Sequence, residues 1–197
     1  MNVWLTSDTH FHHQNIIEYC DRPFPDLEAM HHDIVYDWNA VVNPEDHVYH
    51  LGDFSLGNKD EIREMERKLA GKKMLVLGNH DYESKEFYES IFELGVCRYH
   101  EFNAGAYFEE HNDVQLCLSH YPMLSWNKKY HGSVQVHGHT HDSGGVERSS
   151  PDGERSINYN EPRRFDVGVD GNTWLPVSLL QLIENHVKVD CPRSFYS

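Results

Sequence analysis

The chain is poor in cysteine, in positive charge and in long apolar runs, and each shortage excludes a class of protein. Its four cysteines, Cys20, Cys97, Cys117 and Cys191, lie far apart and form no C-x-x-C pair. A disulfide framework or a thiolate zinc site is therefore not expected. No stretch reaches the roughly 18 apolar residues of a membrane span, and we recognise no signal peptide at the N-terminus. These absences indicate a cytoplasmic protein without a membrane partner.

Positive charge is scarce, because 17 Lys and Arg stand against 32 Asp and Glu, which gives a formal net charge of −15 at pH 7. A surface of this sign repels a phosphate backbone, so broad nonspecific nucleic-acid binding is not expected. A nucleotide or the end of a nucleic acid stays compatible, because bound divalent cations would make a pocket locally positive. The 197 residues fit a single domain, residues 1–197, and the composition does not indicate an oligomeric state.

Short apolar runs alternate with amphipathic segments along the chain. The runs that read as buried strands start at Val3, Val48, Met74, Val114 and Val134. Apolar residues spaced by three and four predict helices over Asp26 to Val42, Asn58 to Gly71 and Ser84 to Leu94. Strands that alternate with helices predict an α/β fold.

The second half of the chain departs from this alternation. Turn signals between short aromatic runs in Tyr99 to Leu118 predict antiparallel strands, and so a mixed second sheet. Residues 143–164 are polar and rich in Gly, Ser and charge, which predicts an exposed loop. Phe165 to Asp170 is predicted to form a strand that returns near the site, and Pro176 to Ser178 to open a last short helix.

Each of the five predicted strands runs into a cluster of metal-ligand side chains. The clusters are Asp8-Thr9-His10, Gly52-Asp53, Gly78-Asn79-His80-Asp81, Ser119-His120 and Gly138-His139-Thr140-His141. Functional loops lie beyond the carboxyl ends of strands in α/β sheets, so the clusters predict one convergent site. Carboxylate, amide and imidazole donors without thiolate suit Mn, Fe, Zn, Ni or Mg. A carboxylate can bridge two cations about 3.5–4 Å apart, which predicts hydrolysis of a phosphate ester.

Taken singly, each cluster has an ordinary explanation. Asp8-Thr9 fits a helix cap, Gly52-Asp53 a plain turn and Asn79-His80 a loop. The joint pattern favours the metal site, because every cluster follows a predicted buried strand. Asp81 is interpreted as an acceptor that supports neighbouring groups.

With these clusters in this order, the chain resembles the calcineurin-like metallophosphoesterase family. The family pattern D-x-H, G-D, G-N-H-D/E, H and G-H-x-H runs here from Asp8 to His141. The chain is also similar to the small bacterial and phage branch of that family. The segments that carry this second likeness are Ser7 to His10, Asn15 to Ile17, Asp21 to Phe24 and Phe165 to Asp170. The resemblance implies a four-layer sandwich of two facing mixed β-sheets flanked by helices.

The resemblance also implies roles for the ligand side chains. The first of two divalent metal ions, with Mn²⁺ favoured, would be held by Asp8, His10 and His141, and the second by Asn79, His120 and His139. Asp53 would bridge the two metals and share the catalytic role with His80, which would lie beside the leaving group. A hydroxide held between the metals would attack phosphorus in line. His80 would donate a proton or hydrogen bond to the departing oxygen.

One position departs from the family pattern. Family members of the protein-phosphatase type carry an Asp three residues after the bridging Asp, and here that position is Leu56. We therefore expect His80 to be held differently or tuned less strongly. The departure also counts against a Ser/Thr protein phosphatase.

Three residues are candidates for substrate contacts. Arg22 is either a bidentate phosphate clamp or an ordinary surface ion-pair partner, and the sequence does not decide between them. His13 either reaches the pocket or lies on the surface at a helix start, and the surface is favoured. Asn79 could contact substrate as well as metal. Tyr121 is interpreted as a packed aromatic rather than a pocket wall.

The sequence favours a dinuclear metal-dependent phosphodiesterase acting on a small phosphoester or nucleotide-like substrate. A phosphomonoesterase, or a nuclease on nucleic-acid ends, is the first alternative and keeps the same site. A non-catalytic metal-binding scaffold is disfavoured, because every ligand position is filled. The natural substrate and the native metal pair stay open.

Overall fold

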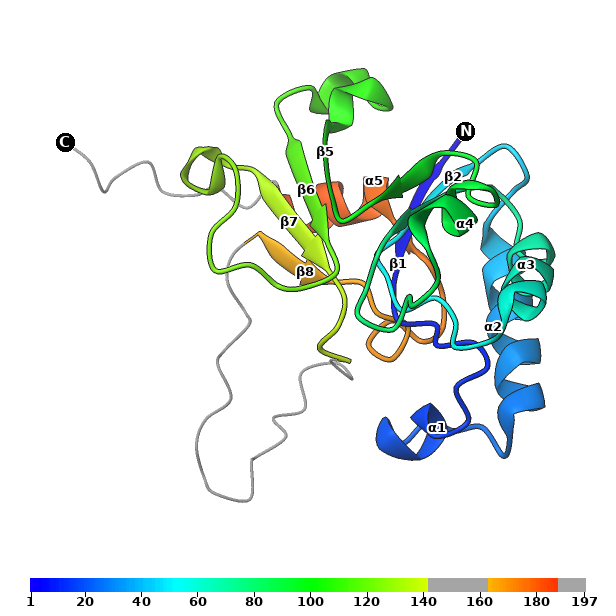
Figure 1. Ribbon diagram of the computed structural model, residues 1–197. Helices are drawn as coiled ribbons and strands as arrows, with labels where there is room; N and C mark the ends of the chain where they lie inside the picture. Colours follow the sequence, from blue (N-terminus) through cyan, green and yellow to red (C-terminus); the bar gives the residue numbers. More distant parts are fainter. Residues whose placement is uncertain (142–162, 188–197) are drawn as a thin grey trace, which may run out of the picture.

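In the computed structural model, residues 1–141 and 163–187 are described, and within them nine strands form two sheets (Figure 1). The first sheet has the order β4-β3-β2-β1-β9 and the second the order β5-β6-β7-β8. The strands are β1 (Val3–Thr6), β2 (His47–His50), β3 (Lys72–Val76), β4 (Gly95–Cys97), β5 (Tyr99–Asn103), β6 (Gln115–Ser119), β7 (Val134–His137), β8 (Arg164–Asp166) and β9 (Val177–Ser178).

The helices of the described residues are short apart from two. They are α1 (Ile16–Tyr19), α2 (Leu27–Val41), α3 (Lys59–Lys68), α4 (Lys85–Glu89) and α5 (Leu179–Leu182), with 3₁₀ turns η1 (Ala104–Ala106), η2 (Glu109–His111) and η3 (Lys129–His131) and a π turn η4 (Ile183–Val187). The predicted alternation of strands and helices is confirmed.

Local sequence explains where the helices begin. The side chain of Asp26 accepts the Ala29 N–H at 2.8 Å and starts α2, whose buried residues are spaced by four along one face. Asn58 forms a capping box with Glu61 at the start of α3. This helix ends at Lys68, before the predicted stop at Gly71, whose φ of 90° instead makes the turn into β3.

Two predicted helices differ from the structure in their extent. Ser84 caps α4, but this helix, predicted to extend to Leu94, ends at Glu89, and residues 90–94 form turns. Val177 and Ser178 form a strand, antiparallel to β1, and Ser178 then caps α5. Both segments carry apolar residues at spacings that suit a helix or a compact turn, so the pattern alone could not set the boundary.

Both sheets are mixed, as predicted. Strands β1 to β4 pair in parallel, and β9 pairs antiparallel with β1. In the second sheet β6, β7 and β8 are parallel, whereas β5 is antiparallel to β6. The parallel strands bring the loops that follow them to the same edge of each sheet.

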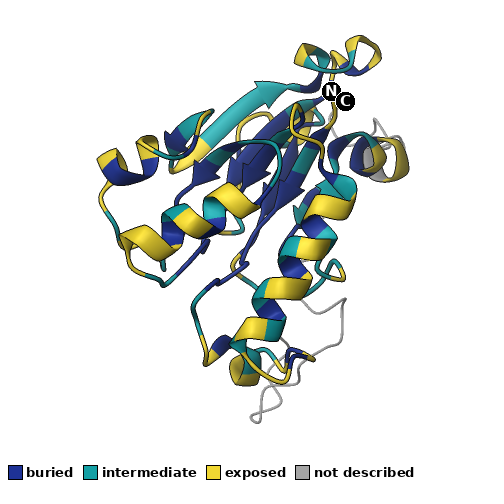
Figure 2. Cartoon of the chain, turned by 90° about the vertical axis from the view of Figure 1, so that its right-hand side faces the viewer, coloured by how far each residue is buried: buried dark blue, intermediate teal, exposed yellow. Residues whose placement is uncertain are grey.

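Two apolar cores separate the layers. Buried residues of β1, β2 and β3 pack against those of β6 and β7, so one core lies between the sheets. The other core lies between the first sheet and α2, α3 and α4, with Trp38, Ile62 and Tyr88 among its members. Figure 2 shows these helices with their buried stripes turned to the strands and their exposed faces outward. The two facing mixed sheets are thus confirmed, and these helices flank the first of them.

The outer face of the second sheet is covered differently in the described residues. Cys117 and Gln135 point away from the core between the sheets, yet both are buried. The segment 121–133 covers them: the Met123 N–H lies 3.4 Å from Gln135 Oε1, and the Cys117 thiol lies 3.6 Å from the Asn127 carbonyl oxygen. Here the flanking layer is a loop with the single 3₁₀ turn η3.

The predicted loop 143–164 lies outside the described residues except at its end. Arg164 begins β8, is buried and donates to the Met123 carbonyl at 3.1 Å, so the exposed loop does not extend to this residue. The predicted strand over 165–170 ends at Asp166, and turns follow. Among the described helices, none has the length and apolar character needed to cross a membrane.

Candidate metal centre

Six loops, each following a strand, bring the polar clusters together. Asp8 and His10 follow β1, Asp53 follows β2 and Asn79 follows β3. From the second sheet, His120 follows β6, His139 and His141 follow β7, and Asp170 follows β8. Backbone hydrogen bonds join the loops: Asp8 N–H to the Gly52 carbonyl and His10 N–H to the Asp53 carbonyl, each at 3.0 Å, and Gly138 N–H to the His120 carbonyl at 3.0 Å. The convergent site predicted from the strand ends is therefore present.

The backbone of these loops is unusual. Five candidate ligands have a left-handed conformation, with φ of 59° at Asp8, 49° at His10, 56° at Asp53, 71° at His139 and 47° at His141. Residues other than glycine rarely adopt it, and each such residue costs on the order of 1–3 kcal/mol. This cost indicates that the fold holds these side chains in one arrangement.

Two glycines allow the loops to approach each other. A Cβ at Gly78 would lie 2.2 Å from Asp53 Oδ1, and one at Gly138 would lie 1.9 Å from Ser7 Oγ and 2.3 Å from Asp8 Oδ2. A side chain at either position would displace a candidate ligand.

The candidate ligands form two groups that meet at Asp53. Ligand atoms of Asp8, His10 and His141 lie within 4.8 Å of one another, and so do those of Asp53, His120 and His139. Asp53 Oδ2 lies 3.5 Å from His10 Nε2 and 3.5 Å from His120 Nε2. Asn79 joins the second group, since its Oδ1 lies 2.9 Å from His120 Nε2. The same Asp53 oxygen thus contacts both groups.

The donor atoms of the first group fit a bound cation. Asp8 Oδ1 and His10 Nε2 are buried and have no hydrogen-bond partner among the described residues. Buried polar atoms without partners are rare and costly, unless an ion or a water satisfies them. Oxygen and imidazole donors are those that Mn, Fe, Zn, Ni and Mg accept. The residues present therefore fit divalent metal ions.

Burial shifts the pKa values of these groups toward their neutral forms. It raises the pKa of Asp8 to about 8, against the influence of nearby His141, and it raises the pKa of Asp53. It also lowers the pKa of His10, His120 and His139. Neutral imidazole is the form that binds a metal, and a cation would favour the two carboxylates as anions.

His141 is the exception among the imidazoles. Burial alone would lower its pKa, but a 2.7 Å hydrogen bond between His141 Nδ1 and Asp170 Oδ2, together with Cys20 and Asp8, raises it to about 10. Cys20, His141 and Asp170 also form a group with ligand atoms within 4.8 Å. Because both oxygens of Asp170 bind other side chains, we interpret Asp170 as the residue that orients His141.

Asp81 supports the site through the backbone, as predicted. Its carboxylate accepts three N–H groups, from Asp53 at 2.9 Å, from Phe54 at 3.0 Å and from Gly78 at 2.8 Å. These bonds tie the loops after β2 and β3 together.

Arg22 has neither of the two roles considered from the sequence. It is buried, and its guanidinium binds both oxygens of Asp170, at 2.8 and 2.9 Å, and the carbonyl oxygens of Asp8 and Thr9, at 2.7 and 3.0 Å. It is therefore not a surface ion-pair partner, and its donors are occupied within the fold rather than available to a phosphate. We do not retain it as a substrate-binding residue.

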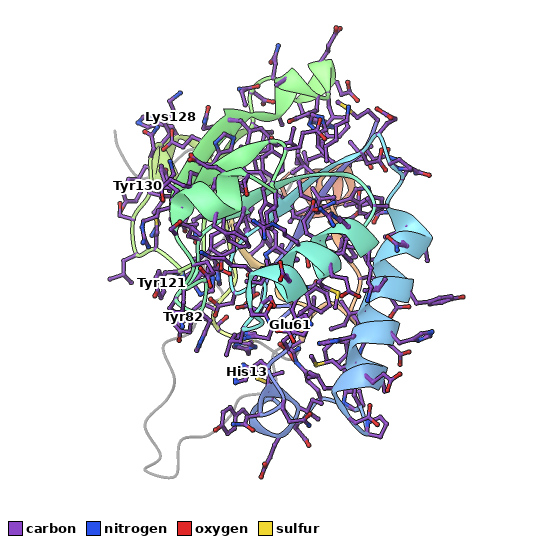
Figure 3. All side chains as sticks on the ribbon, turned by 45° about the vertical axis from the view of Figure 1, so that its right-hand side comes forward. His13, Glu61, Tyr82, Tyr121, Lys128 and Tyr130 are labelled. Atoms are coloured by element: carbon purple, nitrogen blue, oxygen red, sulfur yellow. The ribbon has the colours of Figure 1, made fainter. Side chains whose placement is uncertain are left out.

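The rim of the site is formed by His13, His80, Tyr82 and Tyr121. The preference for a surface position of His13 is corrected: its Nδ1 lies 3.2 Å from His10 Nδ1, and its ring centroid lies 5.8 Å from that of His80. Tyr121 contacts the His139 ring edge-on at 4.6 Å and is 50% exposed, so it is a wall of the site rather than a packed aromatic. Figure 3 shows Tyr121, Tyr82 and His13 one after another along one side of the molecule.

Sequence reasoning missed two residues of the site. Asp170 is the last residue of the segment Phe165 to Asp170 that resembles the family, and that resemblance was the available signal. Tyr82 follows the third cluster, and its hydroxyl lies 2.9 Å from His80 Nδ1. Nothing in the sequence pattern distinguishes it from an ordinary exposed tyrosine.

Comparisons with known proteins give a family match over the part of the chain that contains this site. The family model described as calcineurin-like phosphoesterase matches residues 1–143, which contain all the candidate metal ligands. An uncharacterized protein of Methanocaldococcus jannaschii is 35% identical over 141 residues, covering 71% of this chain and 69% of that protein. The gene 66 protein of Mycobacterium phage L5 is 28% identical over 162 residues, covering 71% of this chain and 77% of that protein. The crystal structure of a protein of unknown function from Aquifex aeolicus matches with a TM-score of 0.68 and 26% identity, over 93% of this chain and 98% of that one.

Proposed function

This chain belongs to the calcineurin-like phosphoesterase family, whose members hydrolyse phosphoesters with divalent metals, and we propose that it is a dinuclear phosphodiesterase acting on a small or nucleotide-like substrate. One observation carries the two-metal part of the proposal. Asp53 Oδ2 lies 3.5 Å from an imidazole of each ligand group. This is the position expected of a carboxylate that two cations would share.

The side chains would divide between two metals. Asp8, His10 and His141 would hold the first, and Asn79, His120 and His139 the second, with Asp53 between them. When bound, the two cations would neutralise phosphoryl oxygens and lower the pKa of a water. The donors suit Mn²⁺, our first choice, and also Fe, Zn, Ni or Mg.

His80 would act on the leaving group. Its backbone N–H donates to Asp53 Oδ1 at 2.8 Å, and its ring centroid lies 5.2 Å from that of His10. The half-buried ring is thus held beside the ligands, where it would donate a proton or a hydrogen bond to the departing oxygen.

Two exposed tyrosines favour a nucleotide-like substrate. Tyr82 is 74% exposed beside His80, and Tyr121 is 50% exposed beside His139. A base stacked on an exposed aromatic ring gains about 1–3 kcal/mol. Diester preference rests on the resemblance to the small branch of the family.

Parallel hydrolysis of bis-p-nitrophenyl phosphate and p-nitrophenyl phosphate tests the proposal. We expect no cleavage in metal-free buffer, and cleavage that favours the diester when Mn²⁺ is added. Faster cleavage of the monoester would replace the diesterase with a phosphomonoesterase. Bound metal without cleavage of either ester would favour the non-catalytic scaffold.

A further inference from the structure

The ring of His80 is held by a tyrosine. Tyr82 Oη lies 2.9 Å from His80 Nδ1, and the two rings meet edge-to-face with centroids 5.7 Å apart. Three residues after Asp53, the chain offers Leu56, an aliphatic side chain that cannot orient an imidazole. Among the described residues, Tyr82 is thus the side chain that hydrogen-bonds the His80 ring, and Nε2 is left for other partners.

We propose that Tyr82 is a positioning residue for His80, a role that rests on the proposed function. The hydrogen bond and the edge contact together fix the direction of the imidazole. The rings of His10 and His13, with centroids 5.2 and 5.8 Å from that of His80, confine it further. With Nδ1 engaged by Tyr82, Nε2 faces the reaction as the atom that assists the leaving oxygen.

The role predicts an effect that depends on the leaving group. Because His80 helps the departing oxygen, its orientation matters most when that oxygen leaves poorly. We expect Tyr82→Phe to lower kcat about 2- to 10-fold for thymidine 5′-phenyl phosphate, as loss of one neutral hydrogen bond would. The same variant should change kcat less than 2-fold for thymidine 5′-(p-nitrophenyl phosphate), and KM should stay unchanged for both.

A double-mutant cycle separates Tyr82 acting through His80 from Tyr82 acting on the substrate. In a His80→Ala background, Tyr82→Phe should cause no further fall in kcat for thymidine 5′-phenyl phosphate. If its effect persists at full size there, the Tyr82 hydroxyl acts on the substrate itself and not through His80, and the positioning role is wrong. Because the Tyr82 side chain is exposed, loss of its hydroxyl should leave folding unchanged, and circular dichroism checks this.

The matched control is Tyr36→Phe, which removes the hydroxyl of another exposed tyrosine, on α2. It should leave kcat and KM unchanged for both substrates. If the wild type is active and Tyr82→Phe has the same kcat for thymidine 5′-phenyl phosphate, the positioning role is wrong, and the proposed function is unaffected. A wild type inactive with every metal would overturn both.

Discussion

At the scale of single residues, three of the candidate ligands anchor one polar atom to the protein and direct another toward the position that a metal would take. Asp8 Oδ2 accepts the His139 N–H at 2.9 Å, while Oδ1 has no partner among the described residues. Asp53 Oδ1 accepts the His80 N–H, and Oδ2 faces the two imidazoles. His120 contacts the Leu51 carbonyl oxygen through Nδ1 at 2.8 Å, so its Nε2 faces Asn79 Oδ1 and Asp53 Oδ2. The anchored atom sets the direction of the other one.

Arg22 should matter for stability. In Arg22→Met, the buried Asp170 carboxylate and the carbonyls of Asp8 and Thr9 lose their donors. Breaking a buried pair in this way costs about 3–5 kcal/mol of unfolding free energy, which urea denaturation followed by circular dichroism measures.

The matched control is Lys85→Met, which removes an exposed ion pair with Glu89 on α4. Its urea midpoint should equal that of the wild type. If Arg22→Met also left the midpoint unchanged, the buried Arg22–Asp170 pair would not contribute as we infer.

At the scale of elements, Asp46 joins β1 to the turn between α2 and β2. It accepts the Asn2 N–H at 2.6 Å, the Trp4 indole N–H at 3.1 Å and the Asn43 N–H at 3.1 Å. Burial alone would raise the pKa of Asp46, but these hydrogen bonds to the charged form hold it well below its usual range.

This lowered pKa predicts how stability changes with pH. The stabilisation from Asp46 should be complete above the unfolded-state pKa of about 4, and it should be lost as the pH falls below that value toward the lower folded-state pKa. Urea midpoints measured from pH 6 down to pH 2 test this. Asp46→Asn should be less stable at pH 6 and lose less stability on acidification; an equally steep acid loss in the variant would refute the assignment.

The sequence predicts elements best where local pattern decides them. The strands before the clusters follow from β-rich runs, and α2 follows from apolar residues spaced by three and four after Asp26. The early end of α4 and the loop over the second sheet depend on tertiary packing, which no local pattern contains. Likewise, the candidate ligand set follows from motifs, whereas the burial of Arg22 depends on a partner 148 residues away.

At the scale of the whole molecule, a chain with net charge −15 buries the carboxylates of Asp8 and Asp53 where the loops of both its sheets meet. A ligand that binds only the folded state raises the free energy of unfolding by about 2.7 kcal/mol when its concentration is 100 times its Kd. For a domain of this size, that corresponds to a rise in Tm of roughly 5–10 °C. We expect Mn²⁺ to produce such a rise and EDTA to reverse it. An equal rise from sodium chloride at matched ionic strength would indicate charge screening instead of site binding.

The most direct test of the central claim is Mn²⁺-dependent hydrolysis of bis-p-nitrophenyl phosphate by Asp53→Asn, measured together with its metal content. The shared oxygen of Asp53 is the point where the two ligand groups meet, so we predict a loss of bound metal and at least about a 100-fold fall in rate. Asp46→Asn, which lies outside the site, should keep the wild-type rate. Wild-type hydrolysis by Asp53→Asn would contradict the two-metal account.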